Sequence, residues 1–373
     1  MIDEKTLKQP VKRIWVLGDL HLGVRANSVE WLEIQQEFFE KVLIPTLKKE
    51  VKSGDVLVQV GDAFDNRQSV NLRVLSYSVD LFERLGKILP VHVICGNHDI
   101  WAKKSNDITS IDALKWIPNV AIYKKPKQFN WSNKNVLLMP WRRDSEHEIE
   151  TLTKYPTANI VMCHSEVSGV SLNAKVKNLH GTDTESYKGY DAVYSGHIHY
   201  RQRKGKLRLV GTPYQLTRSD ANNAKGFDLV DLETMEETFF ENTVSPKFLK
   251  FNLKSLYMVQ LGEFKAQIQN NFVDLYVPSK IATSSALSKL INKVQKISRK
   301  IEPSIYEDES MVDKDLYDMD QIEDLYKNYN ILHLCNMYVD GTNHDEEVKQ
   351  KLKSRLKQLH DMCAYNYDLE QWK

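Results

Sequence analysis

Five short polar clusters stand out in this 373-residue chain, because each ends an apolar run and each carries oxygen or imidazole ligands. The clusters are Asp19-Leu20-His21, Gly61-Asp62-Ala63-Phe64-Asp65, Gly96-Asn97-His98-Asp99, Cys163-His164-Ser165 and Gly196-His197-Ile198-His199. Carboxylates, an amide and several histidines that meet at strand ends are typical of a site for two metal ions. Two adjacent metal ions in turn indicate hydrolysis of a phosphate ester.

Each ligand type suits a particular task in such a site. The carboxylate of Asp62 is the natural candidate to bridge the two ions, because it has two oxygens and a charge. Asp19 and His21 can chelate one ion, since alternate residues of an extended segment point the same way. Asn97 offers an amide oxygen to the other ion. The imidazole nitrogens of the strand-rich half come from His164, His197 and His199. This mixture suits manganese, iron or zinc better than calcium.

Residues beside these ligands suggest further roles. His98 follows Asn97 and cannot easily share its ion, so we expect its imidazole to face the substrate. There it could protonate the leaving oxygen or stabilise charge on the phosphoryl group. Asp99 could orient that imidazole, as carboxylates do for ligating histidines. Asp65 could support the site or cap the helix that follows, and the cap is the preferred interpretation.

Taken singly, the clusters have ordinary structural explanations. Asp-x-His occurs in many surface loops, and Gly-Asp after a strand is usually a turn in which the Asp caps a helix. A single histidine such as His164 is more often satisfied within the core than bound to metal. Alternating histidines such as His197 and His199 are harder to explain without a metal. The metal interpretation is preferred because five clusters in this order, each after a strand, are poorly explained by five independent turns.

Hydrophobic periodicity predicts the elements that position the first three clusters. Short apolar runs that end at glycines predict strands over 13–17, 55–60 and 91–95. Helical periodicity covers 31–49, where Pro45 should cause a kink or break, and 72–89. This order predicts right-handed crossovers and a largely parallel sheet. In such sheets functional groups gather beyond the carboxyl ends of the strands, where these clusters fall.

The remainder of the chain is predicted to be richer in strands. The strands predicted in the second half are 120–123, 136–139, 160–163, 192–195 and 207–210. A β-rich half packed on an α/β half predicts two face-to-face mixed β-sheets flanked by helices, with a smaller α+β capping domain. In that domain we expect a strand at 272–277 and a helix at 284–301.

Two charged segments follow. Residues 302–324 contain ten acidic residues and one basic residue, Lys314, which predicts a solvated insertion or flexible loop. An acidic regulatory or DNA-mimicking arm is the alternative. Residues 345–363 form an amphipathic basic pattern typical of a helix.

Composition limits the class of protein. A formal net charge of +1 gives no global field to recruit DNA or membrane, so DNA contacts would need local basic residues. The candidates are Arg142, Arg143, Arg201, Arg203 and Lys204. A solvated hairpin explains the 201–208 run equally well. Four cysteines without a C-x-x-C pair, no signal-peptide core and no apolar run near the ~18 residues of a membrane helix predict a cytoplasmic protein without membrane contact.

The five clusters resemble the signature of the calcineurin-like metallophosphoesterases, D-x-H, G-D-x-x-D, G-N-H-D, a lone H and G-H-x-H. Within that superfamily the chain is similar to the nuclease subunits of SbcCD-type DNA repair complexes and to the corresponding phage recombination nuclease subunit. Three stretches carry this closer resemblance: Gly61-Asp62-Ala63-Phe64-Asp65, Met139-Pro140-Trp141 and Gly211-Thr212-Pro213-Tyr214-Gln215-Leu216. The resemblance covers residues 12 to 230.

The resemblance implies a division of labour among the candidate residues. One ion would be held by Asp19, His21, Asp62 and His199, and the other by Asp62, Asn97, His164 and His197. His98 would be the catalytic histidine, and both ions would be manganese. The implied activity is exonuclease on double-stranded DNA and endonuclease on single strands, in DNA repair, recombination or replication.

The resemblance also implies an organisation and partners. It divides the chain into a nuclease domain at 1–245, a capping domain at 246–335 that contains the acidic insertion, and a helical segment at 336–373. The last segment would dock on an SMC-like coiled-coil ATPase subunit, with packing of its helix on the capping domain as an equal alternative, and the nuclease subunit would form a homodimer. The competing hypotheses are a small-molecule or phosphoprotein phosphoesterase with the same dimetal core, and a DNA-tethering subunit without catalysis.

Overall fold

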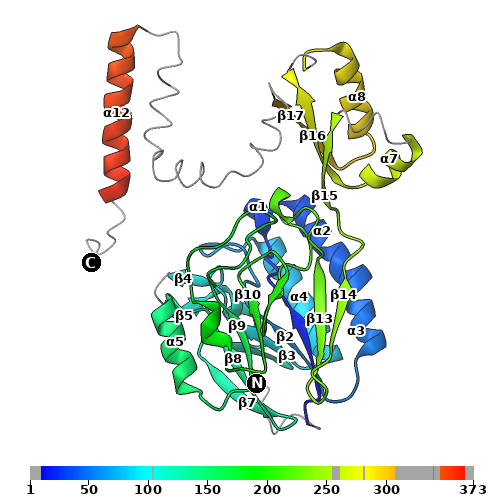
Figure 1. The fold of residues 1–373 in the computed structure, drawn as a ribbon, viewed down its shortest axis with the longest axis vertical. Coiled ribbons are helices and arrows are strands. Elements are labelled where there is room, and N and C mark those ends of the chain that lie inside the picture. The colour runs from blue at the N-terminus through cyan, green and yellow to red at the C-terminus, as the bar shows by residue number, and fades with distance from the viewer. Residues whose placement is uncertain are drawn as a thin grey trace. The chain divides into compact units, whose positions relative to one another are not determined.

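The computed structural model describes residues 10–102, 105–253, 261–279, 282–306, 339 and 345–365. The chain separates into two compact units, Met1–Ile305 and Tyr306–Lys373, and each is described by itself (Figure 1).

A six-stranded mixed sheet forms the first layer of the larger unit. Its spatial order is β14-β13-β1-β2-β3-β6. Its strands are β1 (Arg13–Leu17), β2 (Asp55–Gln59), β3 (Val91–Ile94), β6 (Val120–Tyr123), β13 (Gly226–Asp231) and β14 (Glu237–Glu241). β1, β2, β3 and β6 run parallel, while β13 is antiparallel to β1 and β14 to β13. The predicted parallel core of the first hundred residues is therefore confirmed.

A second six-stranded sheet has the order β11-β12-β10-β9-β8-β7. Its strands are β7 (Lys127–Trp131), β8 (Lys134–Met139), β9 (Ile160–His164), β10 (Ala192–Gly196), β11 (Gln202–Lys204) and β12 (Leu207–Leu209). β8, β9, β10 and β12 are parallel, and the edge strands β7 and β11 are antiparallel to their neighbours.

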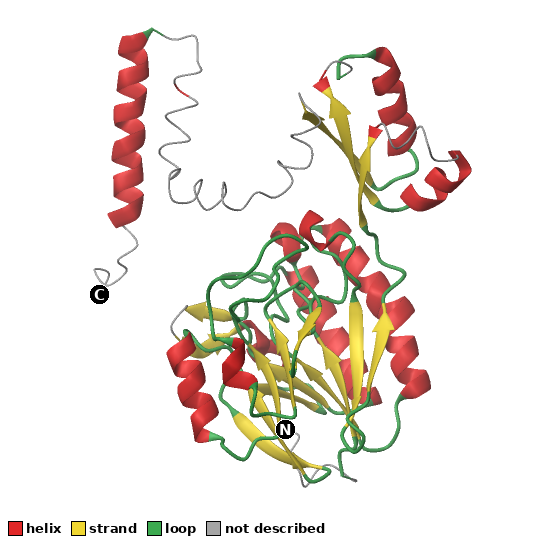
Figure 2. Ribbon diagram, in the orientation of Figure 1, coloured by secondary structure: helices red, strands yellow, loops and turns green. Residues whose placement is uncertain are grey.

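Alternation along the strands explains why the two sheets stack. Trp15 of β1 belongs to the core beneath the helices, while its neighbour Ile14 belongs to the core between the sheets. In β9, Met162 joins the inter-sheet core and Cys163 joins a third core next to α5 (Ser145–Lys154). Side chains on successive strand residues point to opposite faces, so each sheet buries both faces. The result is a helix–sheet–sheet–helix arrangement (Figure 2), which confirms the predicted fold.

The helices of the first sheet are α1 (Val24–Asn27), α2 (Val29–Phe38), α3 (Ile44–Glu50) and α4 (Leu72–Ile88). A π-helical turn, η1 (Phe39–Leu43), separates α2 from α3 directly before Pro45. Proline has no amide hydrogen for the carbonyl four residues earlier, so the hydrogen-bond pattern shifts there. The interruption predicted at Pro45 is thus confirmed. Short elements complete this part: β4 (Ile100–Ala102), β5 (Ser105–Thr109), η2 (Ser110–Leu114), η3 (Thr184–Tyr187) and η4 (Arg218–Asp220).

A small α+β subdomain follows, with the sheet β15-β16-β17 and two helices. Its elements are β15 (Phe248–Asn252), α7 (Leu261–Ile268), β16 (Phe272–Pro278), α8 (Ser285–Gln295) and β17 (Lys300–Tyr306). The helix predicted over 284–301 is too long. The carbonyl of Val294 accepts the amides of Ile297 and Ser298, which ends the helical ladder, and the chain then enters β17. Ile297 and Ile301 continue the apolar spacing of the helix by coincidence, because they pack on the same small core from a turn and a strand.

The acidic segment predicted as an insertion begins inside this strand. Glu302 lies in β17 and forms ion pairs with Arg218 and, at 2.6 Å, with Lys300. Residues 302–306 are therefore strand, and residues 307–324 lie outside the described residues. The boundaries at 245 and 335 stay predictions.

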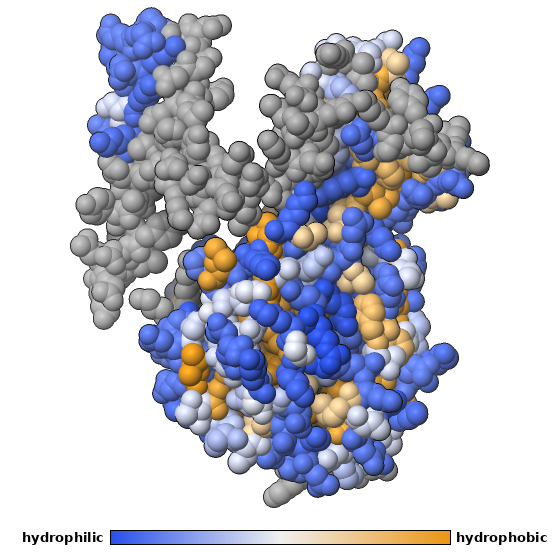
Figure 3. Space-filling view, in the orientation of Figure 1, coloured by the Kyte–Doolittle hydropathy of each residue, from blue (hydrophilic) through white to orange (hydrophobic). Residues whose placement is uncertain are grey.

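In the second unit the structure describes α12 (Glu346–Tyr365), which confirms the predicted amphipathic helix. Val348 and Leu352, one turn apart, are 38% and 40% exposed. Across the described residues, no helix combines the length and the apolar character that a membrane crossing requires. Figure 3 shows that the visible face of the larger unit is mostly hydrophilic, with hydrophobic side chains in several separate groups.

Candidate metal centre

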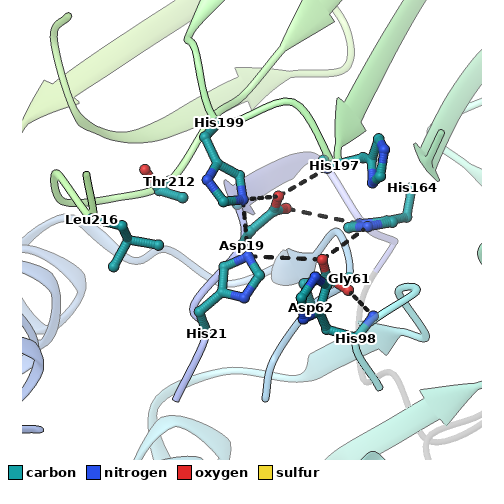
Figure 4. Close-up of polar contacts among 12 residues, drawn as sticks. Asp19, His21, Gly61, Asp62, His98, His164, His197, His199, Thr212 and Leu216 are labelled. Atoms are coloured by element: carbon teal, nitrogen blue, oxygen red, sulfur yellow. Dashed lines mark hydrogen bonds and ion pairs between the residues drawn. The ribbon is translucent and has the colours of Figure 1, made fainter. Parts of the chain in front are cut away.

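Five parallel strands bring the polar clusters to one end of the two sheets. Asp19 and His21 follow β1, Asp62 follows β2, and Asn97 follows β3. From the second sheet, His164 is the last residue of β9, and the pair His197 and His199 follows β10. Figure 4 shows side chains from both sheets pointing toward one another. The structure therefore brings all seven predicted ligands into one place where the sheets meet.

One group of potential ligand atoms comes from Asp19, His21 and His199, which all lie within 4.8 Å of one another. The Nε2 atoms of His21 and His199 are 2.9 Å apart, and His199 Nε2 is 3.8 Å from Asp19 Oδ2. Asp62 Oδ2 is 3.8 Å from His21 Nε2. These are the four residues that the family resemblance assigns to one ion.

A second group comes from Asp62, His164 and His197, again within 4.8 Å of one another. Asn97 Oδ1 is 2.8 Å from both His164 Nε2 and His197 Nδ1. Asp62 Oδ2 is 3.2 Å from His164 Nε2. Asp62 thus lies beside both groups, as a bridging carboxylate must.

The chemistry of these donors fits two divalent cations. Asp19 Oδ1 is fully buried and has no hydrogen-bond partner among the described residues, although a buried carboxylate normally has one. Burial raises the pKa of Asp19 to about 7. Carboxylates, imidazoles and one amide are the ligands that suit divalent transition metals. A cation placed between these groups would satisfy the unpaired oxygen and the two facing imidazole nitrogens together.

Contacts behind two of the histidines favour the ring nitrogen that faces the centre. His164 Nδ1 donates to the carbonyl of Val60 at 2.8 Å, which leaves Nε2 toward Asp62 and Asn97. His21 Nδ1 lies 3.1 Å from Asp65 Oδ1, which leaves Nε2 toward His199. Such outer contacts fix the tautomer and orientation of a metal-binding imidazole.

Asp65 therefore supports the site, and the preferred interpretation of it as a helix cap is wrong. The cap of α4 is Asn71, whose side chain accepts the amide of Arg73 at 2.8 Å. Asp65 comes too early in the chain for that role, because α4 begins at Leu72.

The backbone at three ligands is held in an uncommon conformation. His21, Asp62 and His197 have φ angles of 46°, 53° and 76°, in the left-handed region that non-glycine residues rarely adopt. Conformations of this kind cost of order 1–3 kcal/mol each and cluster at functional sites. Gly61 directly before Asp62 also has a positive φ of 98°, and a side chain there would overlap the ring of His164. Glycine is therefore required at position 61, because His164 at the end of β9 packs closely against it.

Burial and charge set the protonation of the centre. Burial lowers the pKa of His197 to about 3 and that of His199 well below its usual value. Burial opposes protonation of His164 too, but the charges of Asp62 and Asp19 outweigh it and raise that pKa to about 9. For Asp62, burial is outweighed by His164 and His21, which hold its pKa well below the usual range. A cation entering the second group would displace the proton of His164.

Comparison with known proteins agrees with this geometry. The family model described as calcineurin-like phosphoesterase matches residues 12–201, slightly more than half of the chain. This chain belongs to the calcineurin-like phosphoesterase family. The match spans all seven ligand positions of this calcineurin-like phosphoesterase and His98. The predicted family and the phosphoesterase class of enzyme are therefore confirmed, in a family that uses two metal ions.

Several relatives carry more specific names. "Exonuclease subunit 1" of Enterobacteria phage T4 is 26% identical over 355 residues, which cover 92% of this chain and 98% of the relative. "DNA double-strand break repair protein Mre11" of Nanoarchaeum equitans is 23% identical over 241 residues, or 58% of this chain and 65% of the relative. A solved structure described as a novel archaeal phosphodiesterase has 12% identity and a TM-score of 0.32, covering 62% of this chain and 99% of that chain.

His98 of this phosphoesterase belongs to a third group with His21 and Asp62, whose potential ligand atoms also lie within 4.8 Å of one another. Its Nδ1 is 2.7 Å from the carbonyl of Asp65, and its amide donates to Asp62 Oδ1 at 2.7 Å. A carbonyl can only accept, so Nδ1 carries the proton and Nε2 is the nitrogen that gains or loses one. The ring is partly exposed, whereas the ring of His164 is fully buried. This placement suits a group that meets a substrate.

Asp99 does not orient His98, contrary to the prediction. Its buried carboxylate accepts the amides of Gly96 at 2.8 Å and Phe64 at 3.0 Å, and the hydroxyl of Ser110 at 3.3 Å. Among the described residues it has no hydrogen bond with His98. The tight turn after β3 directs this side chain back to the amide three residues earlier, so Asp99 joins the loops that follow β2 and β3.

Three of the five predicted DNA-binding residues come after His199 in the chain, and their DNA-binding role stays a prediction. The guanidinium of Arg201 makes two 2.6 Å bonds to Asp228 and covers the ring of Phe239 at 3.9 Å. Arg203 and Lys204 lie near the turn between β11 and β12, level with Tyr194 and Val193 of β10, whereas the histidines follow the end of that strand. The sequence could not show the pairing of Arg201 with Asp228, because the two residues are 27 positions apart.

The other two basic residues follow a tryptophan that touches the centre. The ring of Trp141 lies 4.9 Å from that of His197 and 5.9 Å from that of His164, measured between centroids. Arg142 and Arg143 come directly after it, but Nε and Nη2 of Arg142 are buried, and Arg143 bonds Asp144 at 3.0 Å. The sequence alone assigned Trp141 no role in the centre, although an aromatic residue just after an apolar strand was a signal for one.

Proposed function

We propose that this protein is a metal-dependent DNA nuclease that hydrolyses phosphodiester bonds with two divalent ions, manganese being the proposed metal. The observation that carries this proposal is the pair of ligand groups around Asp62 with His98 beside them. The DNA substrate is supported by the names of two relatives, one an exonuclease subunit and one a DNA double-strand break repair protein. Exonuclease action on duplex ends and endonuclease action on single strands are the proposed activities.

The proposed ligand assignment is the one that the family resemblance implies, and the distances in the centre support it. Asp19, His21, Asp62 and His199 would hold one ion, and Asp62, Asn97, His164 and His197 the other. Two such ions supply a nucleophile at neutral pH and neutralise charge on the phosphate.

The protein's own part in the reaction centres on His98. With Nδ1 donating to the Asp65 carbonyl, a protonated His98 presents Nε2–H, which can bond a phosphate oxygen and pass its proton to the leaving oxygen. The carbonyl holds the ring in one orientation, so this proton has a fixed direction. Trp141 packs against the ring of His197.

The main alternative is a phosphoesterase that acts on small molecules or phosphoproteins with the same centre. A panel of substrates separates the two functions. Metal-free full-length protein is supplied with Mn²⁺ and given linear duplex DNA, circular single-stranded DNA, cyclic nucleotides and phosphopeptides. We expect cleavage of DNA that EDTA abolishes. Turnover of cyclic nucleotides or phosphopeptides without DNA cleavage would overturn the nuclease proposal.

Two substitutions test the assigned roles. Asp62→Asn should remove the shared carboxylate and abolish activity, and metal analysis that finds two full equivalents would contradict the assignment. His98→Ser should retain both ions and reduce cleavage by about 10²- to 10⁴-fold, the usual effect of a general acid or base. His180→Ser is the matched control, because His180 is an exposed histidine outside both ligand groups. Near-normal cleavage by the His98 variant would exclude its catalytic role.

We also propose two protein partners. The T4 relative is named as a subunit, and α12 presents the exposed apolar residues Val348 and Leu352, which suits docking to an SMC-like ATPase subunit. Trp101 and Trp116 are 60% and 83% exposed, which favours a homodimer. Light scattering of the free protein, and of a mixture with the candidate ATPase, tests both. A monomer at micromolar concentration that forms no complex would refute the two partner proposals.

A further inference from the structure

Lys225 is an unusual residue to find behind the centre. It is 4% exposed and lies just before β13. Its Nζ donates to the carbonyl of His199 and to Asp220 Oδ1, each at 2.6 Å. A buried ammonium group costs several kcal/mol unless it is paired and hydrogen-bonded, so both contacts have energetic weight.

His199 is the ligand that most needs such support. His164 is anchored by a hydrogen bond from Nδ1 to the carbonyl of Val60, and Nδ1 of His21 lies at an ion-pair distance of 3.1 Å from Asp65 Oδ1. For His199 the described residues provide a contact at Nε2, toward His21, and no hydrogen bond at Nδ1. The orientation of its ring therefore depends on where the backbone of residue 199 is held, and Lys225 binds that backbone directly.

The partner of Lys225 is itself fixed. Asp220 is 3% exposed, and its Oδ2 accepts the amides of Leu216 at 3.0 Å and Thr217 at 2.9 Å. Its other oxygen is thus free for Lys225 alone. The ammonium group is held between a rigid turn and the carbonyl of a metal ligand, which leaves little freedom for either.

We propose that Lys225 is a positioning residue for the ion held by Asp19, His21, Asp62 and His199, acting through the carbonyl of His199. This inference rests on the metal assignment made under the proposed function. It does not depend on whether DNA is the substrate. Removing the contact should let residue 199 shift, which would weaken the binding of that ion. The binding of the other ion, by Asn97, His164 and His197, should not change.

A purely structural ion pair is the competing explanation, and the chain offers a matched control for it. Arg201 and Asp228 form a second ion pair with a largely buried carboxylate in the same region, with bonds of 2.6 Å. Arg201 also approaches a backbone carbonyl, but it is that of Val210, which ligates nothing in the assignment. Breaking this ion pair should lower the stability of the fold without lowering the affinity for either ion.

The experiment measures Mn²⁺ binding to the full chain by calorimetry, without DNA. Lys225→Met/Asp220→Asn leaves no buried charge, which avoids the unfolding that a lone Asp220 could cause. We expect the affinity of one of the two Mn²⁺ sites to fall by about 10- to 100-fold, the usual effect of losing a group that orients a ligand. The control Arg201→Met/Asp228→Asn should keep both affinities, and Lys225→Met alone should behave like the double variant wherever it folds.

The other outcomes separate this inference from a structural role and from the nuclease proposal. Two wild-type affinities in the Lys225 double variant, with only a lower melting temperature, would show a structural role and overturn it. Equal loss of affinity in the Arg201 control would overturn it as well. Wild-type protein that binds two ions but cleaves no DNA would refute the nuclease proposal and leave this inference standing. Wild-type protein that binds fewer than two ions would refute both.

Discussion

Replacing Asp99 with alanine tests how the centre is assembled. Asp99 is fully buried, and its carboxylate joins the loop after β2 to the loop after β3 by accepting the amides of Phe64 and Gly96. The first loop carries Asp62 and the second carries Asn97, one ligand from each. We therefore expect Asp99→Ala to destabilise the fold and loosen the metal centre together.

The size of the effect follows from the groups left without a partner. Two buried amides lose their acceptor, and each unsatisfied group costs about 1–3 kcal/mol, or about 2–6 kcal/mol together. Burial and the charge of Asp62 raise the pKa of Asp99, which offsets part of its benefit in the wild type. We therefore expect the lower part of that range, about 2–4 kcal/mol. For a domain of this size that lowers the melting temperature by about 4–16 °C.

Thermal unfolding in EDTA, followed by Mn²⁺ calorimetry, measures both consequences. Asp144→Ala is the matched control, because Asp144 is an exposed carboxylate that caps α5 by accepting the amide of His147 at 3.0 Å. Its loss should cost only about 0.5–2 kcal/mol and leave Mn²⁺ binding unchanged. An Asp99→Ala variant that melts within 2 °C of the wild type (about 0.5 kcal/mol) and binds both ions normally would refute this reasoning. If DNA cleavage by that variant also fell as in His98→Ser, the result would support the expectation from the sequence that Asp99 orients the imidazole of His98.

Three further predictions concern stability. Gly61→Ala should lower the free energy of unfolding by at least about 1–2 kcal/mol in urea melts, because alanine is strained at φ 98° and its methyl group would overlap His164; an unchanged midpoint would contradict this. Mn²⁺ at 100 times its dissociation constant should stabilise the protein by about 2.7 kcal/mol per site, and EDTA should reverse the shift in melting temperature. Burial lowers the pKa of His92 to about 3, so the folded protein keeps this ring neutral while the unfolded chain is protonated below about 6.5. The protein therefore loses stability as pH falls below 6.5. Between pH 7 and pH 5 the free energy of unfolding of His92→Phe should fall by about 2 kcal/mol less than that of the wild type, with both measured in EDTA.

The fold could be predicted largely because its strands are short, continuous apolar runs. A strand buried on both faces, such as β2 with all five residues buried, leaves a clear signal in the sequence. The boundary between α8 and β17 was missed because Ile297 and Ile301 have the spacing of a helix while they pack from a turn and a strand. Local periodicity cannot distinguish these cases, since the small core that accepts both residues is made by other elements.

The candidate site divides in the same way. Ligands at strand ends were predictable, because parallel strands deliver their carboxyl ends to one edge whatever the loops do. The roles of Asp65 and Asp99 were not, because each depends on where a tight turn directs a side chain. The ion pair of Arg201 with Asp228 was equally hidden, since it joins residues that meet only after β13 pairs with β1. Sequence motifs thus indicate which groups can ligate, and tertiary structure decides which groups support them.

The energetics of the centre explain why so many supports are present. Two buried carboxylates lie close together in the centre, and one oxygen of Asp19 lacks a hydrogen bond among the described residues. Three ligands also hold left-handed backbone conformations. Each of these features opposes folding, so the surrounding contacts must hold the ligands in place before an ion arrives. The buried anchors of His164, His21 and His199 meet that need, and ion binding then returns part of the stability that the preformed centre costs.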